Sequence, residues 1–398
     1  MQAFIYDAVR TPRAKAKPNG TLADIPPVAL VKTAYDALNG RLGGAAAAAE
    51  RLTLGCVGQV GPQGGHIALV SKLYCGMAEA MPAVSLNNYC VSGLTAVGDA
   101  ARAVATGEAG LALAGGVESM SQVPFLGDRA TYYADPAFSA AMRFIPVATA
   151  ADALATLEGV GRAELDAVAL ASHARAALAE STGRGLRSRV PVSGPDGAVR
   201  LARDEYVRAD TTAEGLARFQ PGFAEVNAPY APILKDALGL ADMAPVHAVV
   251  HAPGMCDAAA LALVGTQEAG ARRGLTPRAR ILALAEAGGH PVLSLLAGFD
   301  AMDRALARAG MTLADIDVLE VMEAFAVVPA LFQRRTRVDP DRVNVFGGHI
   351  AKGHPLGASG AILLSSLLDA MEDRDATTGL VVATGASGIG SAMILSRA

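Results

Sequence analysis

The sequence has no tryptophan, and charged residues account for only 18% of its 398 positions. Basic and acidic residues nearly balance, 34 against 38, which gives a net charge of −4. Because no basic stretch is present to neutralise a phosphate backbone, we expect no nucleic-acid partner. The chain also lacks any run of about 18 uninterrupted apolar residues, so we expect no membrane-spanning helix and no membrane partner.

Cysteine is scarce as well, with four residues spread far apart along the chain. None belongs to a CxxC pair or has a histidine at metal-ligand spacing, so the sequence predicts free thiols and no metal site. The first ten residues lack the basic and apolar segments of a signal peptide. We therefore expect the protein in the cytoplasm. The four residues are Cys56, Cys75, Cys90 and Cys256.

Apolar residues, in contrast, make up 52% of the chain. This composition favours an α/β protein with many alanine-rich packed helices, and it also suits an obligate oligomer that covers part of its apolar surface. At about 150 residues per domain, the length predicts two or three domains.

Cys90 lies in a short segment, 87–93, between two predicted elements. The run 82–87 predicts a buried strand, and apolar residues at helical spacing predict a helix from about 92 to 105. A thiol at the N-terminus of a helix has its thiolate favoured by the helix dipole. We therefore expect Cys90 to be a nucleophile that accepts an acyl group.

His354 lies in a second glycine-rich segment, 347–360. A strand is predicted before it at 344–346, and the residues after it repeat at helical spacing. An imidazole here can take the proton of a thiol. Because the second segment repeats the plan of the first, the sequence predicts a duplicated α/β fold whose halves meet at a shared site. The residues at helical spacing are Leu364, Leu367, Leu368 and Met371.

Five motifs in this order resemble those of the thiolases, which include acetyl-CoA acetyltransferase and 3-ketoacyl-CoA thiolase. The resemblance covers essentially the whole chain. It implies a five-layered α/β fold of two αβαβα halves with an inserted CoA-binding loop domain. The motifs lie at 7–12, 87–93, 115–121, 204–208 and 353–360. The implied parts are an N-terminal half at 1–120 completed by about 250–272, a loop domain covering CoA at 121–249, and a C-terminal half at 273–398.

The resemblance also implies an activity, the interconversion of acyl-CoA plus acetyl-CoA with 3-oxoacyl-CoA plus CoA, as in fatty acid metabolism. Cys90 would carry the acyl group and His354 would activate it. Coenzyme A is then a substrate, so we expect no separate cofactor. The positions implied to contact it are Arg208, Pro253 and Ala386, and the implied assembly is a homodimer or homotetramer.

Two positions depart from the family motifs. The asparagine that helps hold the oxyanion-hole water is replaced by Met322, whose thioether cannot donate a hydrogen bond. The second catalytic cysteine, which normally shuttles a proton, is replaced by Thr384, whose hydroxyl is a much weaker acid than a thiol. No cysteine follows Cys256, so a shifted alignment does not restore the missing thiol.

These replacements leave several hypotheses open. His349, His290 or His251 could replace the lost acid or base, and Cys256 is a weaker candidate for a second thiol. The chain could instead be a Cys/His acyl-enzyme with a different acceptor, either an acyltransferase or a slow thioesterase. A non-catalytic, thiolase-like CoA-binding subunit would explain both replacements, although the predicted nucleophile and base are retained.

Overall fold

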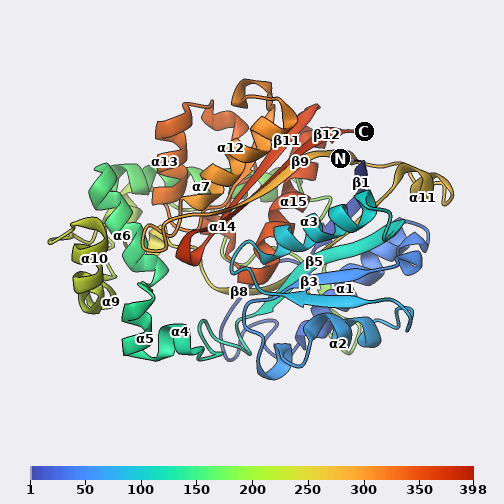
Figure 1. Cartoon of the computed structure of the whole chain (residues 1–398), viewed down its shortest axis with the longest axis horizontal. Coiled ribbons are helices and arrows are strands. Elements are labelled where there is room, and N and C mark those ends of the chain that lie inside the picture. The colour runs from blue at the N-terminus through green and yellow to red at the C-terminus, as the bar shows by residue number, and fades with distance from the viewer. Residues whose placement is uncertain (1) are drawn as a thin grey trace.

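One mixed sheet of ten strands passes through both halves of the chain (Figure 1). The computed structural model describes residues 2–398. Along the sheet the strand order is β10-β11-β12-β9-β1-β8-β5-β3-β4, and β2 pairs with β8 at the side. The strands are β1 (Ala3–Arg10), β2 (Ala14–Lys15), β3 (Leu52–Gly55), β4 (Ala83–Leu86), β5 (Leu111–Ser119), β8 (Cys256–Gly265), β9 (Ala279–Gly288), β10 (Val318–Val321), β11 (Thr378–Gly385) and β12 (Ile389–Arg397).

The strand pairing repeats between the two halves. In the first half β3 runs parallel to β5, β5 antiparallel to β8, and β8 antiparallel to β1. In the second half β10, β11, β12 and β9 follow the same pattern. The halves join where Ala3, Phe4 and Ile5 of β1 pair with β9. The predicted internal duplication is therefore confirmed.

Helices form three layers around the two parts of the sheet. The helices α3 (Ser92–Ala105) and α15 (Leu356–Asp373) pack against each other in the centre. The outer face of the first half is covered by α1 (Pro27–Arg41) and α2 (Ile67–Tyr74), and that of the second half by α12 (Ala297–Ala309). The predicted five-layered α/β fold is confirmed, as is the predicted helix at 92–105.

Glycines allow the two central helices to approach closely. A Cβ on Gly93 of α3 would lie 2.8 Å from the nitrogen of Ala361, and one on Gly360 of α15 would lie 2.5 Å from the nitrogen of Leu94. Any larger residue would push the helices apart at their N-terminal turns. Both helices therefore begin beside each other at the centre of the molecule.

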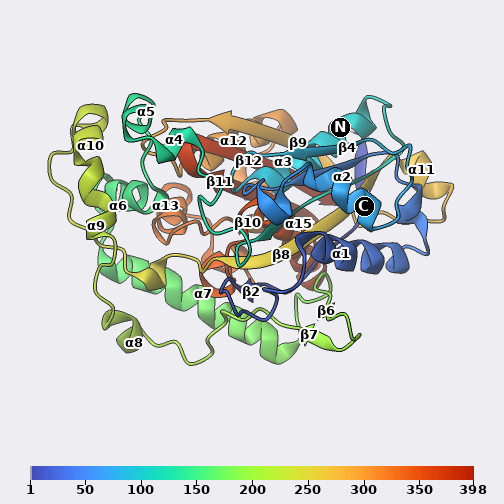
Figure 2. The same ribbon diagram turned by 90° about the horizontal axis from the view of Figure 1, so that it is seen from below.

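The middle of the chain forms a mainly helical region, and α6, α9 and α10 lie together at one end of the molecule in both ribbon views (Figures 1 and 2). A two-stranded sheet, β6 (Val192–Ser193) and β7 (Val199–Leu201), belongs to the same region. No helix within residues 2–398 is long and apolar enough to cross a membrane. The remaining helices are α4 (Thr131–Ala134), α5 (Pro136–Ala141), α6 (Val147–Glu158), α7 (Arg162–Thr182), α8 (Ala213–Ala217), α9 (Ala224–Asn227), α10 (Ala231–Leu238), α11 (Gln267–Ala271), α13 (Val327–Thr336) and α14 (His349–Lys352).

The strand predicted at 344–346 is wrong. Val343 makes only an isolated bridge to Leu319, and the chain then turns at Asn344, whose φ is 48°. The Asn344 side chain accepts a hydrogen bond from the N–H of Val321 (2.8 Å) and donates one to its carbonyl (2.9 Å). The side chain thus replaces the ladder that a strand would have formed beside β10.

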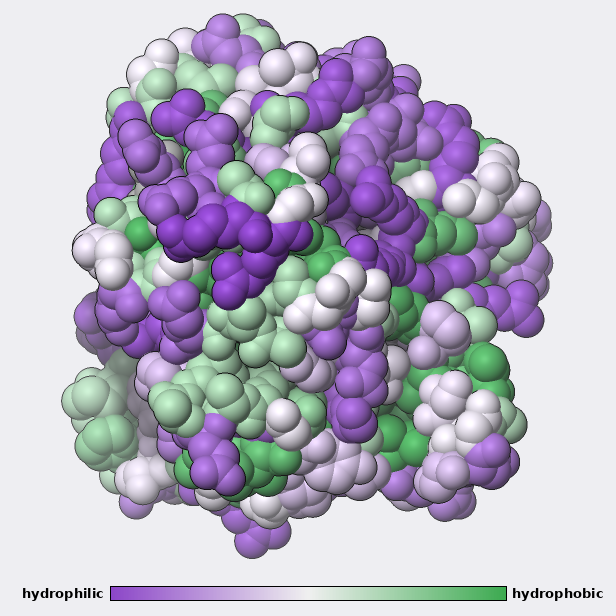
Figure 3. Space-filling model, turned by 90° about the vertical axis from the view of Figure 1, so that its right-hand side faces the viewer, coloured by the Kyte–Doolittle hydropathy of each residue, from purple (hydrophilic) through white to green (hydrophobic). Residues whose placement is uncertain are grey.

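Apolar side chains are exposed on α2. The helix packs against β4, which is an edge strand of the large sheet. Figure 3, which views the molecule from the right-hand side of Figure 1, shows hydrophobic surface in its lower half, at the level of α1 and α2. An apolar helix beside an unpaired strand edge is typical of an interaction surface. The exposed side chains are Leu69, Val70, Leu73 and Tyr74.

Candidate active site

Cys90 is held in a tight turn between β4 and α3, two residues before the helix begins. Tyr89 has a φ of 46°, a strained conformation for a residue other than glycine. The Oγ of Ser92 accepts a hydrogen bond from the N–H of Asn88 (2.8 Å) and donates one to the carbonyl of Tyr89 (2.6 Å). The turn is therefore fixed mainly by contacts within its own segment, with one further hydrogen bond from the Asn87 amide to the carbonyl of Val57 (3.3 Å).

The Cys90 thiol is buried, and burial raises its pKa to about 12. The main-chain N–H groups of Ala386 and of Cys90 itself act in the opposite direction, and the negative charge of Glu118 raises the pKa further. The expected stabilisation of the thiolate at a helix N-terminus is thus outweighed by desolvation. At neutral pH the side chain is a thiol that needs a base.

His354 lies two residues before α15, and its main-chain N–H donates a hydrogen bond to the carbonyl of Gly254 (2.8 Å). Its Nδ1 is 2.8 Å from the Oγ of Ser359, whereas its Nε2 is buried without a hydrogen-bond partner among the described residues. Burial, helped by the positive charge of Arg13, lowers the His354 pKa to about 3. The ring is therefore neutral at physiological pH and able to accept a proton.

The structure brings the segments of the two residues together. The first turns of α3 and α15 are in contact, as the close approaches of Gly93 and Gly360 require. The end of β11 joins them, because a Cβ on Gly385 would lie 3.5 Å from the nitrogen of Cys90. The predicted nucleophile and base thus stand at the meeting point of the two halves.

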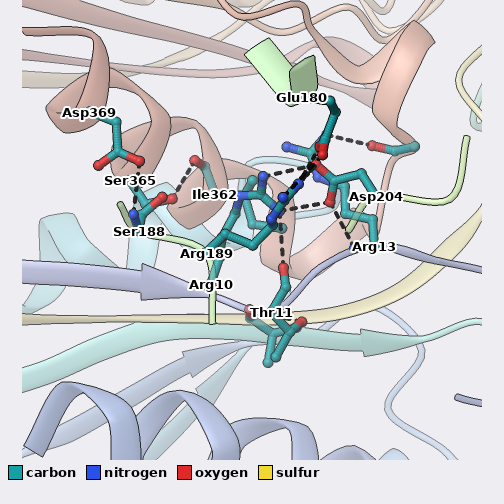
Figure 4. A network of polar contacts seen from close by, with 12 residues as sticks. Arg10, Thr11, Arg13, Glu180, Ser188, Arg189, Asp204, Ile362, Ser365 and Asp369 are labelled. Carbon is teal, nitrogen blue, oxygen red and sulfur yellow. Dashed lines mark hydrogen bonds and ion pairs between the residues drawn. The ribbon is translucent and has the colours of Figure 1, made fainter. Parts of the chain in front are cut away.

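A buried ionic network contacts the segment of His354 through the carbonyl of Gly353. Figure 4 shows Arg10 and Arg13 converging on Asp204, with two hydrogen bonds from the Arg10 guanidinium (2.8 and 2.9 Å) and one from the N–H of Arg13 (2.9 Å). Burial alone would raise the Asp204 pKa, but the two arginines hold it well below its usual range. The Arg13 guanidinium also donates to the carbonyl of Gly353 (3.0 Å), directly before His354.

Two buried carboxylates bind the same segment through its main chain. Glu118 accepts a hydrogen bond from the N–H of Gly357 (2.9 Å), and Glu323 accepts one from the N–H of Ile350 (3.0 Å). Glu323 also accepts one from the hydroxyl of Ser172 (2.7 Å). Glu118 lies in the motif at 115–121 and Glu323 directly follows the replaced position Met322, but their anchoring role was not predicted because it depends on tertiary contacts.

The sequence patterns also gave no prediction for two buried titratable side chains that interact with each other. Lys352 and Glu320 are both almost fully buried. Burial lowers the pKa of Lys352 and raises the pKa of Glu320, and each group opposes the shift of the other. A lysine within an otherwise apolar, glycine-rich segment was the only signal in the sequence.

The two replaced positions supply no free proton donor. Thr384, at the end of β11, is buried and donates its hydroxyl hydrogen to the carbonyl of Leu295 (2.7 Å). Met322 is fully buried in the large apolar cluster, and its main-chain N–H donates to Val382 (2.9 Å). Neither side chain can therefore act as the cysteine or asparagine would.

The alternative residues differ in their availability. Both ring nitrogens of His251 already have partners, because Nδ1 accepts a hydrogen bond from the N–H of Ala248 (3.0 Å) and Nε2 lies 2.7 Å from Asp166. His290 is exposed. Cys256 is buried, and burial raises its pKa well above the usual value. Only His349 combines full burial with two ring nitrogens that have no partner within residues 2–398.

The predicted CoA-contacting residues fall in two places. Arg208 lines a cavity of about 410 Å³, a volume typical of small-molecule sites. Pro253 is half-buried between two residues that line the same cavity, Ala252 and Gly254. Ala386 instead lies at Cys90, where its N–H faces the sulfur. The other lining residues are His173, Tyr206, Asp210, Thr211, Thr212, Gly215, Leu216, Phe219, Val249, Val250 and Ile350.

Comparison with known proteins gives consistent matches along the chain. Residues 3–239 match the family model of the thiolase N-terminal domain, and residues 275–397 match that of the thiolase C-terminal domain. The β-ketoadipyl-CoA thiolase of Pseudomonas aeruginosa is 35% identical over an alignment 421 positions long, which covers 100% of this chain and 99% of that protein. The 3-ketoacyl-CoA thiolase of Cronobacter sakazakii is 34% identical over an alignment 406 positions long, with the same coverage.

Proposed function

Because the chain belongs to the thiolase family, we propose that it is a thiolase-type acyltransferase that carries its acyl group on Cys90 and uses His354 as the base. One observation carries the assignment of these roles. A buried thiol lies where the two halves meet, beside a segment whose buried, neutral imidazole has an Nε2 with no partner among the described residues. A thiol and a base in such a site are the parts that acyl transfer requires.

In the cleavage direction, the Cys90 thiol gives its proton to Nε2 of His354 while the sulfur attacks C3 of a 3-oxoacyl-CoA. The bond between C2 and C3 then breaks, and C2 takes the proton held by His354, so that acetyl-CoA leaves. The acyl group remains as a thioester on Cys90. The thiol of a CoA molecule attacks this thioester, and its proton returns through His354 to the departing sulfur.

The chemical surroundings favour this sequence of steps. The Ala386 N–H next to the Cys90 sulfur stabilises negative charge as the thiol ionises. Ser359 can accept the Nδ1 hydrogen of His354, which leaves Nε2 as the proton acceptor. The cavity at Arg208 and the segment around Pro253 would receive CoA, with the exposed guanidinium available to its phosphates.

The relatives support 3-oxoacyl-CoA thioesters as the substrate class, since the two named above are a β-ketoadipyl-CoA thiolase and a 3-ketoacyl-CoA thiolase. The Thr384 hydroxyl already donates its hydrogen to the carbonyl of Leu295. This favours a second candidate function, in which Cys90 passes its acyl group to another nucleophile or to water. This second reaction needs no further thiol.

We further propose that the protein is a homodimer or homotetramer in the cytoplasm. The exposed apolar side chains of α2, beside the edge strand β4, support an association between copies of the chain. The four free cysteines suit a reducing compartment.

The direct test is acylation of the purified protein by acetyl-CoA, followed by mass spectrometry. We expect an added acetyl group on the peptide that contains Cys90, and none in Cys90→Ala. Thiolysis of acetoacetyl-CoA and of a longer 3-ketoacyl-CoA should be abolished by the same substitution. An unmodified Cys90 after prolonged incubation, with no thiolysis, would contradict the proposed function and favour a non-catalytic subunit.

A further inference from the structure

His349 is a buried polar side chain that has no hydrogen-bond partner among residues 2–398. It begins α14, is fully buried, and has no hydrogen-bond partner for either Nδ1 or Nε2 in the part of the chain that the structure describes. Buried side-chain nitrogens are nearly always paired, because an unpaired one has lost its hydrogen bonds to water. Two unpaired nitrogens on one ring therefore indicate a position where a water or a polar group of a substrate would bind.

The neighbour of this ring is the proposed base. The centroids of His349 and His354 are 5.0 Å apart, and the two rings are almost perpendicular, at 86°. The Nε2 of His354 is also buried without a partner among the described residues. Three nitrogens without partners among the described residues thus lie on two neighbouring rings, one of which belongs to the proposed base.

His349 is neutral. Burial, together with the positive charges of Arg13 and Lys352, lowers its pKa well below the usual value. A neutral imidazole has one N–H that donates and one nitrogen that accepts. Unlike the thioether of Met322, it can give a hydrogen bond to an oxygen.

The segment that carries His349 packs against the segment that carries Met322. Glu323, the next residue, accepts a hydrogen bond from Ile350, and a Cβ on Gly348 would lie 2.1 Å from its carboxyl carbon. Both neighbours of His349 thus contact the residue after Met322. Thr384 is held elsewhere, by Leu295 and beside α12.

We propose that His349 supplies the oxyanion hydrogen bond that Met322 cannot give. Its N–H donates to the oxygen of the reacting carbonyl, or to a water that contacts this oxygen, as negative charge develops there. His354 donates to the same oxygen once it holds the proton of Cys90. No bond to His349 forms or breaks. The inference rests on the proposed acyl transfer.

The test compares two substitutions of similar bulk that differ in hydrogen bonding. His349→Gln keeps a donor, whereas His349→Phe has none. We expect the rate of Cys90 acylation by acetyl-CoA to fall about 10²–10³-fold in His349→Phe, the loss typical of a missing oxyanion donor, and less than about 10-fold in His349→Gln. Asp36→Asn, on the exposed face of α1, is the control and should stay within about 3-fold of the wild type.

A rescue experiment adds the family's donor back. Met322→Asn in the His349→Phe background should recover at least about 10-fold of the lost rate, and the urea midpoint of each variant checks that it is folded. Equal rates for the two His349 variants, or a folded double variant without recovery, would overturn the role of His349. If the wild type itself is not acylated, the proposed function fails instead, so the two failures are distinguishable.

Discussion

The segments that carry Cys90 and His354 occupy equivalent places in the two halves, yet they are held in different ways. The turn at Cys90 is fixed mainly by its own neighbours, through the Ser92 hydroxyl and the strained Tyr89. The segment of His354 is held from outside, by main-chain hydrogen bonds to side chains that lie far away in the sequence. These side chains are Arg13, Glu118 and Glu323.

The difference follows from what each residue must do. A nucleophile needs only to be presented at a defined place, which a short turn can achieve. A base in a buried site must stay neutral, and the main-chain N–H groups of its loop need partners away from water. Carboxylates distant in the sequence accept these hydrogen bonds. The position of the proposed base, His354, therefore depends on the whole fold, whereas the position of the proposed nucleophile, Cys90, depends mainly on its own segment.

The largest expected effect comes from removing the base. His354→Gln should lower the rate of Cys90 acylation about 10²–10⁴-fold at neutral pH, because the thiol must then ionise without help. The wild-type rate should be nearly constant from pH 5 to 9 (a range well above the His354 pKa of about 3), whereas the variant rate should rise about 10-fold per pH unit, since burial raises the Cys90 pKa to about 12. Stopped reactions analysed by mass spectrometry give both profiles. A flat profile for His354→Gln would mean that another group removes the proton.

The next effect concerns the buried ionic network that contacts the segment of His354. Asp204→Asn leaves Arg10 and Arg13 without their buried partner, and we expect a loss of about 3–5 kcal/mol in the free energy of unfolding. Urea denaturation at pH 7 measures this loss. Asp36→Asn, which breaks the exposed pair with Lys32, is the matched control and should cost about 0.5 kcal/mol or less.

The same variant has a defined pH dependence. Because its native pKa is held below the value of about 3.9 in the unfolded chain, Asp204 stabilises the protein above pH 4 and loses this contribution as the pH falls. Wild type and Asp204→Asn should therefore approach each other in stability below about pH 4. A difference that stays constant down to pH 2 would argue against the ionic contribution of Asp204.

The smallest expected effect tests the replaced position at the end of β11. Thr384→Cys restores an acid with a pKa near that of CoA, so thiolysis of acetoacetyl-CoA should rise about 10-fold while acylation of Cys90 by acetyl-CoA stays unchanged. Thr384→Ser keeps a hydroxyl and serves as the control. If the cysteine variant gains nothing, the native protein already moves this proton by another route, as proposed here for His354.

The local elements were accessible from the sequence because their signals are local. Periodic apolar residues predicted the helix at 92–105, and the duplicated pattern predicted the pairing of the two halves. The strand predicted at 344–346 failed because Asn344 bonds its side chain to β10 and turns the chain instead. The anchoring roles of Arg13, Glu118 and Glu323 depend on tertiary contacts. For Arg13 and Glu118, the contact joins residues more than two hundred positions apart, and a periodic sequence pattern cannot predict such a contact.

By itself, the sequence determined the fold and supplied the candidate site residues, since helical periodicity, the repeated loop and the family motifs are all local features of the chain. It also determined that Met322 and Thr384 cannot do the work of the asparagine and the cysteine. Only the tertiary structure decided which histidine is available, because it bonds His251 to Asp166 and leaves His290 exposed. Of the three, only His349 is buried with no partner for either ring nitrogen in the described part of the chain, and burial is a property that packing creates.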